Sequence, residues 1–279
     1  MSYLKFVFSI PEHLHEHFIA ELMDMDFYGF EQFDNELIAY VEKRRFNDSN
    51  RELIEQLTAL FPNCSVREMD EVEEQNWNES WEKTIQPQAI GSFFVKPTWS
   101  KAEPDKTQIL LEIDPKMAFG TGYHATTRLA LRQISQKDCS GLKVMDAGTG
   151  TGILGIAAIK MGALKVVGFD TDPWSENNAV ENTYINGAEE QFDVRFGGIE
   201  QIMDDEIFDL SVANINRNVI LEILEFLAEH THPGGEVIIT GLLNTDEETI
   251  RNKIKSLPVS VMDMTREDEW ILFHLKRES

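Results

Sequence analysis

Residues 144–152 read VMDAGTGTG, and residues 166–170 read VVGFD. Each apolar run contains or ends in an acid, and alternating glycines followed by a helical segment lie between the two runs. This is the pattern of a βαβ nucleotide-binding unit. Its glycines let the backbone approach a ligand closely, and the N-terminus of its helix presents N–H groups to that ligand. Asp170, at the carboxyl end of the second strand, is then placed where a ribose would offer its hydroxyls.

Two ligand classes fit this unit. Gly150, Gly152 and Gly155 satisfy G-x-G-x-x-G, so an NAD-dependent oxidoreductase is one candidate. Asp146 favours the other class, because a carboxylate just before the turn suits a cationic ligand and repels a pyrophosphate. S-adenosylmethionine carries an ammonium and a sulfonium beside an adenosine that Asp170 could hold. A ligand-free tight turn and a non-catalytic module that binds S-adenosylmethionine are the remaining alternatives.

Composition narrows the class of partner. The chain has 279 residues, with 25 basic and 49 acidic side chains and a formal net charge of −24. That charge argues against direct capture of DNA, RNA or an anionic membrane; it either serves solubility alone or attracts a basic protein partner. Cys64 and Cys139 fit neither a disulfide framework nor a zinc knuckle. The sequence shows no apolar leader and no apolar run long enough to span a membrane, so we expect a cytoplasmic protein.

The first part of the chain predicts a small domain and a connection. Residues 1–72 read as strand, helix, two strands, helix and strand, the βαββαβ order of an α+β ferredoxin-like sandwich. Residues 73–98 predict a linker helix and hinge, in which Trp77 and Trp81 share one helix face. An edge strand of the next domain is expected at residues 90–95, because prolines bracket an apolar run there.

The second part of the chain predicts a larger α/β domain at residues 99–279. From a strand at residues 108–113 onward, strands alternate with helices, which is typical of a doubly wound, mostly parallel sheet. Two successive strands close the chain and predict an antiparallel hairpin at one edge.

A possible metal motif occurs in the first domain. Residues 13–17, His-Leu-His-Glu-His, contain H-x-x-E-H, the pattern of an inverted zinc metalloprotease site. His13 and His17 would share one face of a helix. Because the segment begins within a turn of Pro11 and the small domain offers no evident cleft, we expect a solvated first turn and no metal.

Three further motifs make the resemblance of this sequence to a known family specific. AFGTG at residues 118–122 is followed by HATT at residues 124–127, and VANI stands at residues 212–215. Together with the glycine-rich unit, they resemble the bacterial methyltransferases that modify protein eleven of the large ribosomal subunit, its stalk-base protein. The resemblance spans essentially the whole chain. It implies a seven-stranded Rossmann-like methyltransferase sheet, S-adenosylmethionine as methyl donor, and an N-terminal domain that recognises a basic ribosomal protein; we expect the enzyme to be a monomer.

The resemblance also implies which residues contact S-adenosylmethionine or shape its pocket: Thr127, Asp146, Gly148, Gly150, Asp170 and Asn214. The turn at residues 120–122 can close over the methionine end of the ligand, which makes Thr121 a further candidate. Three positions depart from the family's pattern. Lys116 stands for its usual Gly, Ala125 for its usual Pro, and Thr149 for its usual Cys.

Asn214 and Phe119 are the expected catalytic residues for N-methylation of lysine side chains and an N-terminal amine. The Asn214 amide oxygen can accept a hydrogen bond from the attacking amine and aim the nitrogen lone pair at the methyl carbon; the alternative role of Asn214 is to cap a turn. Phe119 can shield the site from water and stack near the methyl group, or it can belong to the core. Methyl transfer depends mainly on positioning, so no metal is expected.

Overall fold

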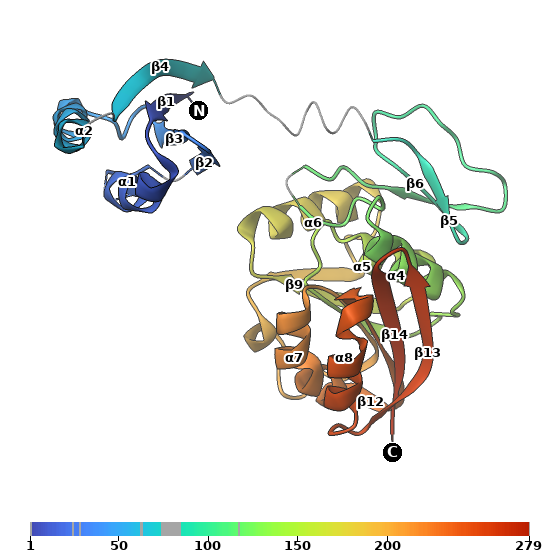
Figure 1. The fold of residues 1–279 in the computed structure, drawn as a ribbon. Coiled ribbons are helices and arrows are strands. Elements are labelled where there is room, and N and C mark those ends of the chain that lie inside the picture. Colours follow the sequence, from blue (N-terminus) through green and yellow to red (C-terminus); the bar gives the residue numbers. More distant parts are fainter. Residues whose placement is uncertain are drawn as a thin grey trace. The chain divides into compact units, whose positions relative to one another are not determined.

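The computed structural model describes residues 2–23, 25–27, 29–61, 64–73, 85–116 and 118–278. The chain divides into two compact units, residues 1–77 and 78–279, and each is considered by itself (Figure 1). Trp77, Trp81 and the linker helix expected around them lie outside the described residues. Within the described part of the chain, no helix has the length and apolar character that crossing a membrane requires.

The first unit is a four-stranded antiparallel sheet with two helices. The strands pair in the order β2-β3-β1-β4, and their bounds are β1 (Ser2–Ser9), β2 (Gly29–Phe33), β3 (Glu36–Glu42) and β4 (Ser65–Glu73). A short 3-10 turn, η1 (Glu12–Leu14), leads into α1 (His15–Met23), and α2 (Asp48–Leu60) precedes β4. Phe6 and Phe8 of β1 share one core with Phe18 of α1 and Ile54 of α2, so both helices pack on one face. The predicted βαββαβ sandwich is confirmed.

The histidines in and around the H-x-x-E-H motif have different surroundings: His15, which lies inside the motif but is not one of its ligand positions, differs from the motif residue His17. His15 is buried, and its Nε2 lies 3.3 Å from the carbonyl oxygen of Ile10. The ring of His17 lies edge-on to Phe61, with 5.3 Å between ring centroids. Among the described residues, no group of three or more His, Cys, Asp and Glu is arranged to hold a metal.

The second unit is built on a seven-stranded sheet in the order β10-β9-β8-β11-β12-β14-β13. The strand bounds are β8 (Lys143–Ala147), β9 (Lys165–Asp170), β10 (Phe192–Phe196), β11 (Phe208–Asn214), β12 (Thr231–Leu243), β13 (Val259–Glu267) and β14 (Trp270–Arg277). The strands from β10 to β12 are parallel neighbours, and β14 runs antiparallel to both β12 and β13. The predicted mostly parallel sheet with an antiparallel edge hairpin is confirmed.

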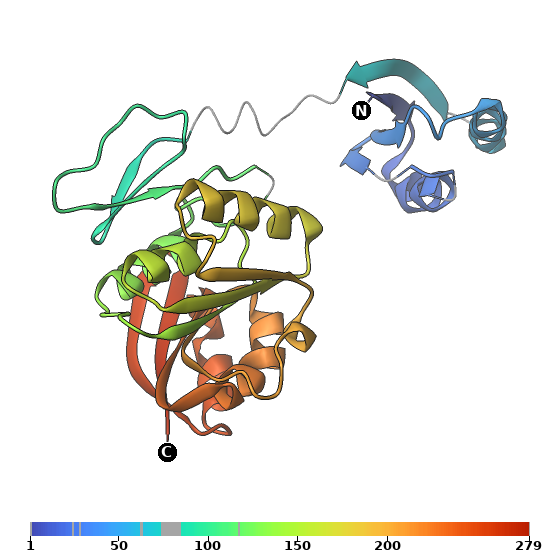
Figure 2. The ribbon, with the colours of Figure 1, turned by 180° about the vertical axis from the view of Figure 1, so that it is seen from behind.

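Helices cover both faces of this sheet (Figures 1 and 2). The helices are α4 (Ala125–Ser135), α5 (Ile153–Lys160) and α6 (Pro173–Ile185) on one face, and α7 (Arg217–Glu229) and α8 (Glu247–Ile254) on the other. Short 3-10 turns, η2 (Ile199–Gln201) and η3 (Asn244–Asp246), follow β10 and β12. Among the strands of this sheet, β8 comes first in the chain. The next strand, β9, lies on one side of β8 and β11 lies on the other, so the strand order reverses at β8. Sheets of this kind place ligands in the crevice at such a point, beyond the carboxyl ends of the strands.

Two strand predictions for the second unit were wrong in detail. The strand expected at residues 108–113, β7 (Ile109–Glu112), does not join the large sheet; it belongs to a separate three-stranded sheet. The single edge strand expected at residues 90–95 is a hairpin of β5 (Gln88–Ile90) and β6 (Phe93–Lys96) in the same small sheet. Alternating apolar segments identify strands, but they do not show which sheet a strand joins, because that depends on packing. Here the small sheet buries Phe93 and Leu111 against the core under α4 and α5.

Candidate active site

A cavity of about 760 Å³ opens at the carboxyl ends of the parallel strands. Its lining begins at Asp170 of β9 and extends past Asn214 of β11 and Gly241 of β12 to Trp270 of β14. Neighbouring strands lie about 4.8 Å apart, so the four spacings from β9 to β14 span roughly 19 Å. The cavity is therefore long enough to hold an adenosine at the β9 end and a second reactant at the β14 end.

The glycine-rich turn after β8 forms the floor of the cavity, and two of its glycines are sterically required. Gly148 and Gly150 have φ of +70° and +56°, in the left-handed region. A Cβ at Gly150 would collide with the carbonyl oxygen of Phe119, and one at Gly148 would collide with the side chain of Ile215. Both glycines line the cavity, so the backbone itself is the surface that a ligand would meet.

Asp170 lies beside this turn, where the sequence places it. Its Oδ2 accepts a hydrogen bond from the Gly150 amide at 2.9 Å, and its Oδ1 accepts one from the Asp172 amide at 3.0 Å. The two bonds fix the carboxylate at the end of β9, facing the cavity. Each carboxylate oxygen has a second lone pair, so Asp170 retains capacity to accept hydroxyl donors.

Asp146 occupies a different position from the one that the cation argument assumed. It is only 1% exposed and does not line the cavity. Its Oδ2 accepts hydrogen bonds from the Thr149 hydroxyl at 2.7 Å and from the Gly155 amide at 3.0 Å. Burial raises the pKa of Asp146 to about 7. The side chain therefore ties the turn to the first turn of α5, and its geometry is that of a residue that shapes the turn from below.

Asn214 ends β11 with its side chain at the centre of the cavity wall. It is 9% exposed, and its Nδ2 donates to the hydroxyl of Thr127 at 3.3 Å. Its Oδ1 is buried and has no hydrogen-bond partner among the described residues. A buried amide oxygen without a donor is costly, so this atom marks a place where a ligand's N–H is expected. Thr127 is itself fully buried, so it acts on the cavity through its hydrogen bond with Asn214.

Phe119 stands on the loop that covers the glycine-rich turn. Its ring is 52% exposed and lines the cavity, while its carbonyl oxygen accepts a hydrogen bond from the Thr151 amide at 2.8 Å. The Thr151 hydroxyl also donates to the carbonyl oxygen of Gly120 at 2.7 Å. Two bonds from one residue thus attach the Phe119 loop to the turn below it.

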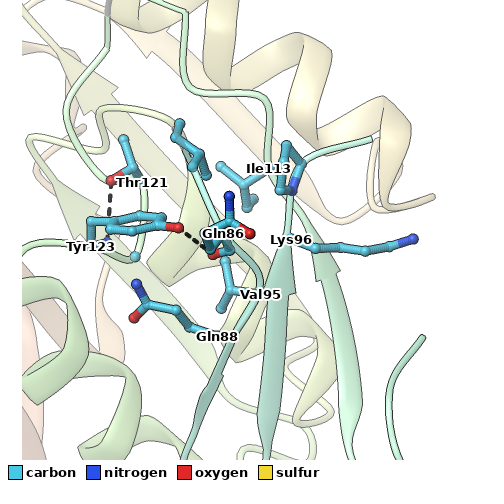
Figure 3. A pocket seen from close by; sticks show the side chains of 10 residues that line it. Gln86, Gln88, Val95, Lys96, Ile113, Thr121 and Tyr123 are labelled. Carbon is cyan, nitrogen blue, oxygen red and sulfur yellow. Dashed lines mark hydrogen bonds between the residues drawn. The ribbon is translucent and has the colours of Figure 1, made fainter. Parts of the chain in front are cut away.

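The far side of the same loop rests on the small sheet (Figure 3). Thr121 faces this side: its Oγ1 accepts a hydrogen bond from the Tyr123 amide at 3.2 Å, and it lines a small pocket with Val95 and Ile113. The Tyr123 hydroxyl donates to the carbonyl oxygen of Gln86. Among the candidate residues, Thr121 is thus placed away from the cavity, where it stabilises the loop that carries Phe119.

Several residues of the cavity were not singled out from the sequence. An aromatic wall lies at the β14 end, where His124 contacts both Phe119 and Trp270 with ring centroids 5.3 and 4.6 Å apart. Burial, assisted by the nearby Arg128, lowers the pKa of His124, so this ring is neutral at pH 7. Trp270 follows a hairpin turn without any motif around it, and only the sheet topology brings it to this crevice.

The charged residues in the described lining of the cavity are acidic. Asp170, Asp172, Glu200 and Glu222 line it, and among the described lining residues none is a Lys or an Arg. None of the four carboxylates forms an ion pair with a described side chain. The preference for a cationic ligand that the sequence analysis attached to Asp146 is thus supplied by other acids, and this lining would repel a pyrophosphate.

The three departures from the family's pattern have local explanations. Lys116 has φ of +43°, a conformation that a glycine adopts without strain, and its ammonium pairs with Glu181. Ala125 is the first residue of α4 after the N-cap His124, a position that proline also favours. Thr149 supplies the hydroxyl that bonds to Asp146.

Comparison with known proteins agrees with this geometry. The family model described as ribosomal protein L11 methyltransferase (PrmA) matches residues 13–278. Proteins named ribosomal protein L11 methyltransferase are similar to the chain: one from Chlorobaculum parvum is 36% identical over 97% of this chain and 95% of its own length. Another from Phocaeicola vulgatus is 35% identical over 87% of each. A crystal structure of ribosomal protein L11 methylase from Lactobacillus delbrueckii subsp. bulgaricus is 30% identical, with a TM-score of 0.65 over 70% of this chain and all of that one. The chain belongs to the ribosomal protein L11 methyltransferase family.

Proposed function

We propose that this protein transfers methyl groups from S-adenosylmethionine to amino groups of ribosomal protein L11, on lysine side chains and at the N-terminus. The observation that carries the proposal is the Asn214 side chain, which lines the cavity and whose buried Oδ1 has no donor among the described residues. An attacking amine brings the N–H that this oxygen lacks. The family to which the chain belongs supports the same reaction and the same substrate.

The β9 end of the cavity suits the adenosine half of the methyl donor. Gly148 and Gly150 leave room for a ligand against bare backbone, and Asp170 can accept the two ribose hydroxyls in charge-assisted hydrogen bonds. Asp146 and Thr121 act from outside the cavity, the first by holding the turn and the second by holding the loop above it. When bound, S-adenosylmethionine supplies a methyl group on a cationic sulfur, and the four carboxylates of the lining favour that positive charge.

The part of the cavity from β11 to β14 suits the acceptor amine. Asn214 would accept a hydrogen bond from the amine and orient its lone pair, while Thr127 holds the amide in place through the Nδ2 contact. Amines attack only when neutral, and the aromatic wall of Phe119 and Trp270 lowers the polarity around the incoming nitrogen. Orientation of this kind, with no nucleophile or metal from the protein, supplies most of the acceleration in a direct displacement.

The first unit is proposed to recognise the substrate through residues 1–72. Within the connection expected at residues 73–98, β5 and β6 belong to the small sheet of the second unit and are not part of a hinge. Residues 1–86 contain 19 acidic and 7 basic side chains, a surplus that attracts a basic ribosomal protein. We propose that the enzyme works as a monomer, in the cytoplasm, where its ribosomal substrate is made.

The direct test is incorporation of labelled methyl groups into purified L11 by this protein, with titration of S-adenosylmethionine and of NADH in parallel. We expect transfer into L11 and saturable binding of S-adenosylmethionine alone. Binding of NADH without methyl transfer would favour the oxidoreductase alternative. Binding of S-adenosylmethionine without transfer to any protein would favour a non-catalytic module.

A further inference from the structure

Helix α6 (Pro173–Ile185) buries small or polar side chains and exposes large apolar ones, the reverse of an ordinary surface helix. The residues that it buries are small or polar: Ser175, Asn178, Ala179, Asn182 and Thr183. Three of its four large apolar residues point outward, where Trp174 is 69%, Val180 51% and Tyr184 74% exposed; Ile185 is half-buried. Surface helices place their apolar stripe toward the core, so the apolar side chains of α6 contribute little to holding it in the fold.

Polar contacts hold the helix instead. Asn182 Nδ2 donates to the carbonyl oxygen of Thr151 at 3.0 Å, and Asn178 Nδ2 donates to that of Asp114 at 2.8 Å. Asn186, which caps the C-terminus, donates to the carbonyl oxygen of Glu112 at 2.7 Å. At the N-terminus, Asp172 accepts from the Trp174 amide at 3.1 Å. The exposed Trp and Tyr are therefore presented on a firmly anchored helix, and rigid aromatic side chains are the commonest hot spots of protein interfaces.

The surroundings of this face are acidic. From Asp172 to Asp193 the sequence has six acidic residues and no Lys, Arg or His. Lys116 pairs with Glu181, and Lys165 and Arg195 pair with Asp193, but Glu176, Glu189 and Glu190 form no ion pair with a described side chain. The helix begins beside the cavity, because its N-cap Asp172 and Ser175 of its first turn line that cavity.

We propose that the outward face of α6, formed by Trp174, Val180 and Tyr184 among these acids, is a docking surface for a basic protein, the ribosomal substrate itself. The proposal rests on the proposed function for the identity of that partner. Charge complementarity selects a basic partner, and the aromatic residues supply contact area beside the cavity. The catalytic unit then captures its substrate directly, in addition to any recognition by the first unit.

The test compares the double variant Trp174→Ser/Tyr184→Ser with a matched control, Leu164→Ser/Met262→Ser, whose side chains are 60% and 50% exposed away from α6. Binding of purified L11 is measured directly by calorimetry, alongside KM and kcat for methyl transfer and the affinity for S-adenosylmethionine. We expect Kd and KM for L11 to rise roughly 5- to 30-fold in the α6 variant, with kcat and cofactor affinity unchanged. The control should change each value less than two-fold.

A second variant, Glu176→Gln/Glu189→Gln/Glu190→Gln, should weaken L11 binding at low salt and flatten its salt dependence. An unchanged Kd for L11 in both the aromatic and the acidic variant overturns the proposal. Weaker binding of S-adenosylmethionine would assign the face to the cofactor site, and a change in oligomeric state would assign it to a second copy of the chain; either result overturns it. If the parent chain binds L11 but transfers no methyl group, the proposed function fails while the docking surface stands.

Discussion

The two ends of the large sheet differ in whether the carboxylates that line a cavity there form ion pairs. At the carboxyl ends of the strands, the four cavity carboxylates lack ion-pair partners among the described side chains. At the amino ends, a second cavity of about 560 Å³ is lined by Lys137, Asp209 and Glu236, and here Glu236 forms an ion pair with Lys137 while Asp209 accepts a hydrogen bond from the Lys143 amide. Glu236 accepts from Lys137 and, at 2.5 Å, from His274.

The pKa shifts at the amino end follow from this pairing. Burial opposes ionisation of Glu236, but hydrogen bonds from Lys137 and His274 outweigh it and lower the pKa of the carboxyl. Burial, together with the nearby Lys137, lowers the pKa of His274. Charges that satisfy one another stabilise the fold, whereas charges left open at a cavity are available to a ligand. The comparison therefore separates a structural end of the sheet from a functional one.

The largest expected effect concerns the cavity floor. Gly150→Ala puts a Cβ into the carbonyl oxygen of Phe119, so we expect loss of S-adenosylmethionine binding by more than about 100-fold or loss of stability of several kcal/mol. Gly187→Ala is the matched control, because Gly187 has a similar φ of +62° with nothing within 4 Å of the added Cβ. It should cost only about 1 kcal/mol of stability and leave binding intact. Equal effects of the two substitutions would mean that the strain, and not the cavity floor, is what matters.

Next in size is the contrast between two aspartates that each accept a backbone N–H. Asp170→Ala should weaken S-adenosylmethionine binding by about 1.5 to 3 kcal/mol, because a charged acceptor of two hydroxyls is lost. Asp209→Ala removes the acceptor of the Lys143 amide at the other end of the sheet and should leave the dissociation constant unchanged. Calorimetric titration measures both. A similar loss of affinity in the two variants would break the distinction between the ends.

A substitution at the amino ends of the strands is expected to change the stability of the protein and not its affinity for the cofactor. Lys137→Met leaves Glu236 with His274 as its remaining partner, so the free energy of unfolding should fall by about 1 to 3 kcal/mol. Urea denaturation checks this value, and cofactor titration on the same sample checks that binding is unchanged. Reduced cofactor affinity at equal stability would show that the amino end communicates with the cavity.

A pH effect is expected from Asp146. Its folded-state pKa of about 7 lies above its usual value of 3.8, so the folded state binds a proton that the unfolded state has released. The stabilisation is complete below pH 4 and is lost as the pH rises to about 7. In Asp146→Asn, the side-chain oxygen can still accept from Thr149 and Gly155, because both bonds go to one oxygen. Relative to the parent, this variant should gain up to roughly 2 to 4 kcal/mol between pH 4 and pH 8. Parallel stability curves for the two proteins would refute a raised pKa.

The sequence predicts the parts of the site that lie within one continuous unit. Gly148, Gly150 and Asp170 follow from the βαβ pattern, and the end of β11 at Asn214 follows from its apolar run. The surroundings of Asp146 could not be predicted, because a strand residue's face and partners depend on the helix that packs below it. Trp270 and Glu222 come from segments without motifs, and they reach the cavity only through the strand order. The same reason explains why β7 was assigned to the wrong sheet.

The central claim is that the cavity at the carboxyl ends orients an amine through Asn214, and single-turnover methyl transfer into L11 at saturating S-adenosylmethionine tests it. We predict that Asn214→Ala lowers the transfer rate by about 100-fold or more while cofactor affinity changes less than ten-fold, because the lost acceptor acts mainly as the bond forms. Thr127→Val, which removes only the hydroxyl that holds the Asn214 amide, should show a smaller loss in rate. Equal single-turnover rates in Asn214→Ala and the parent protein would contradict the account and reduce Asn214 to a structural residue at the end of β11.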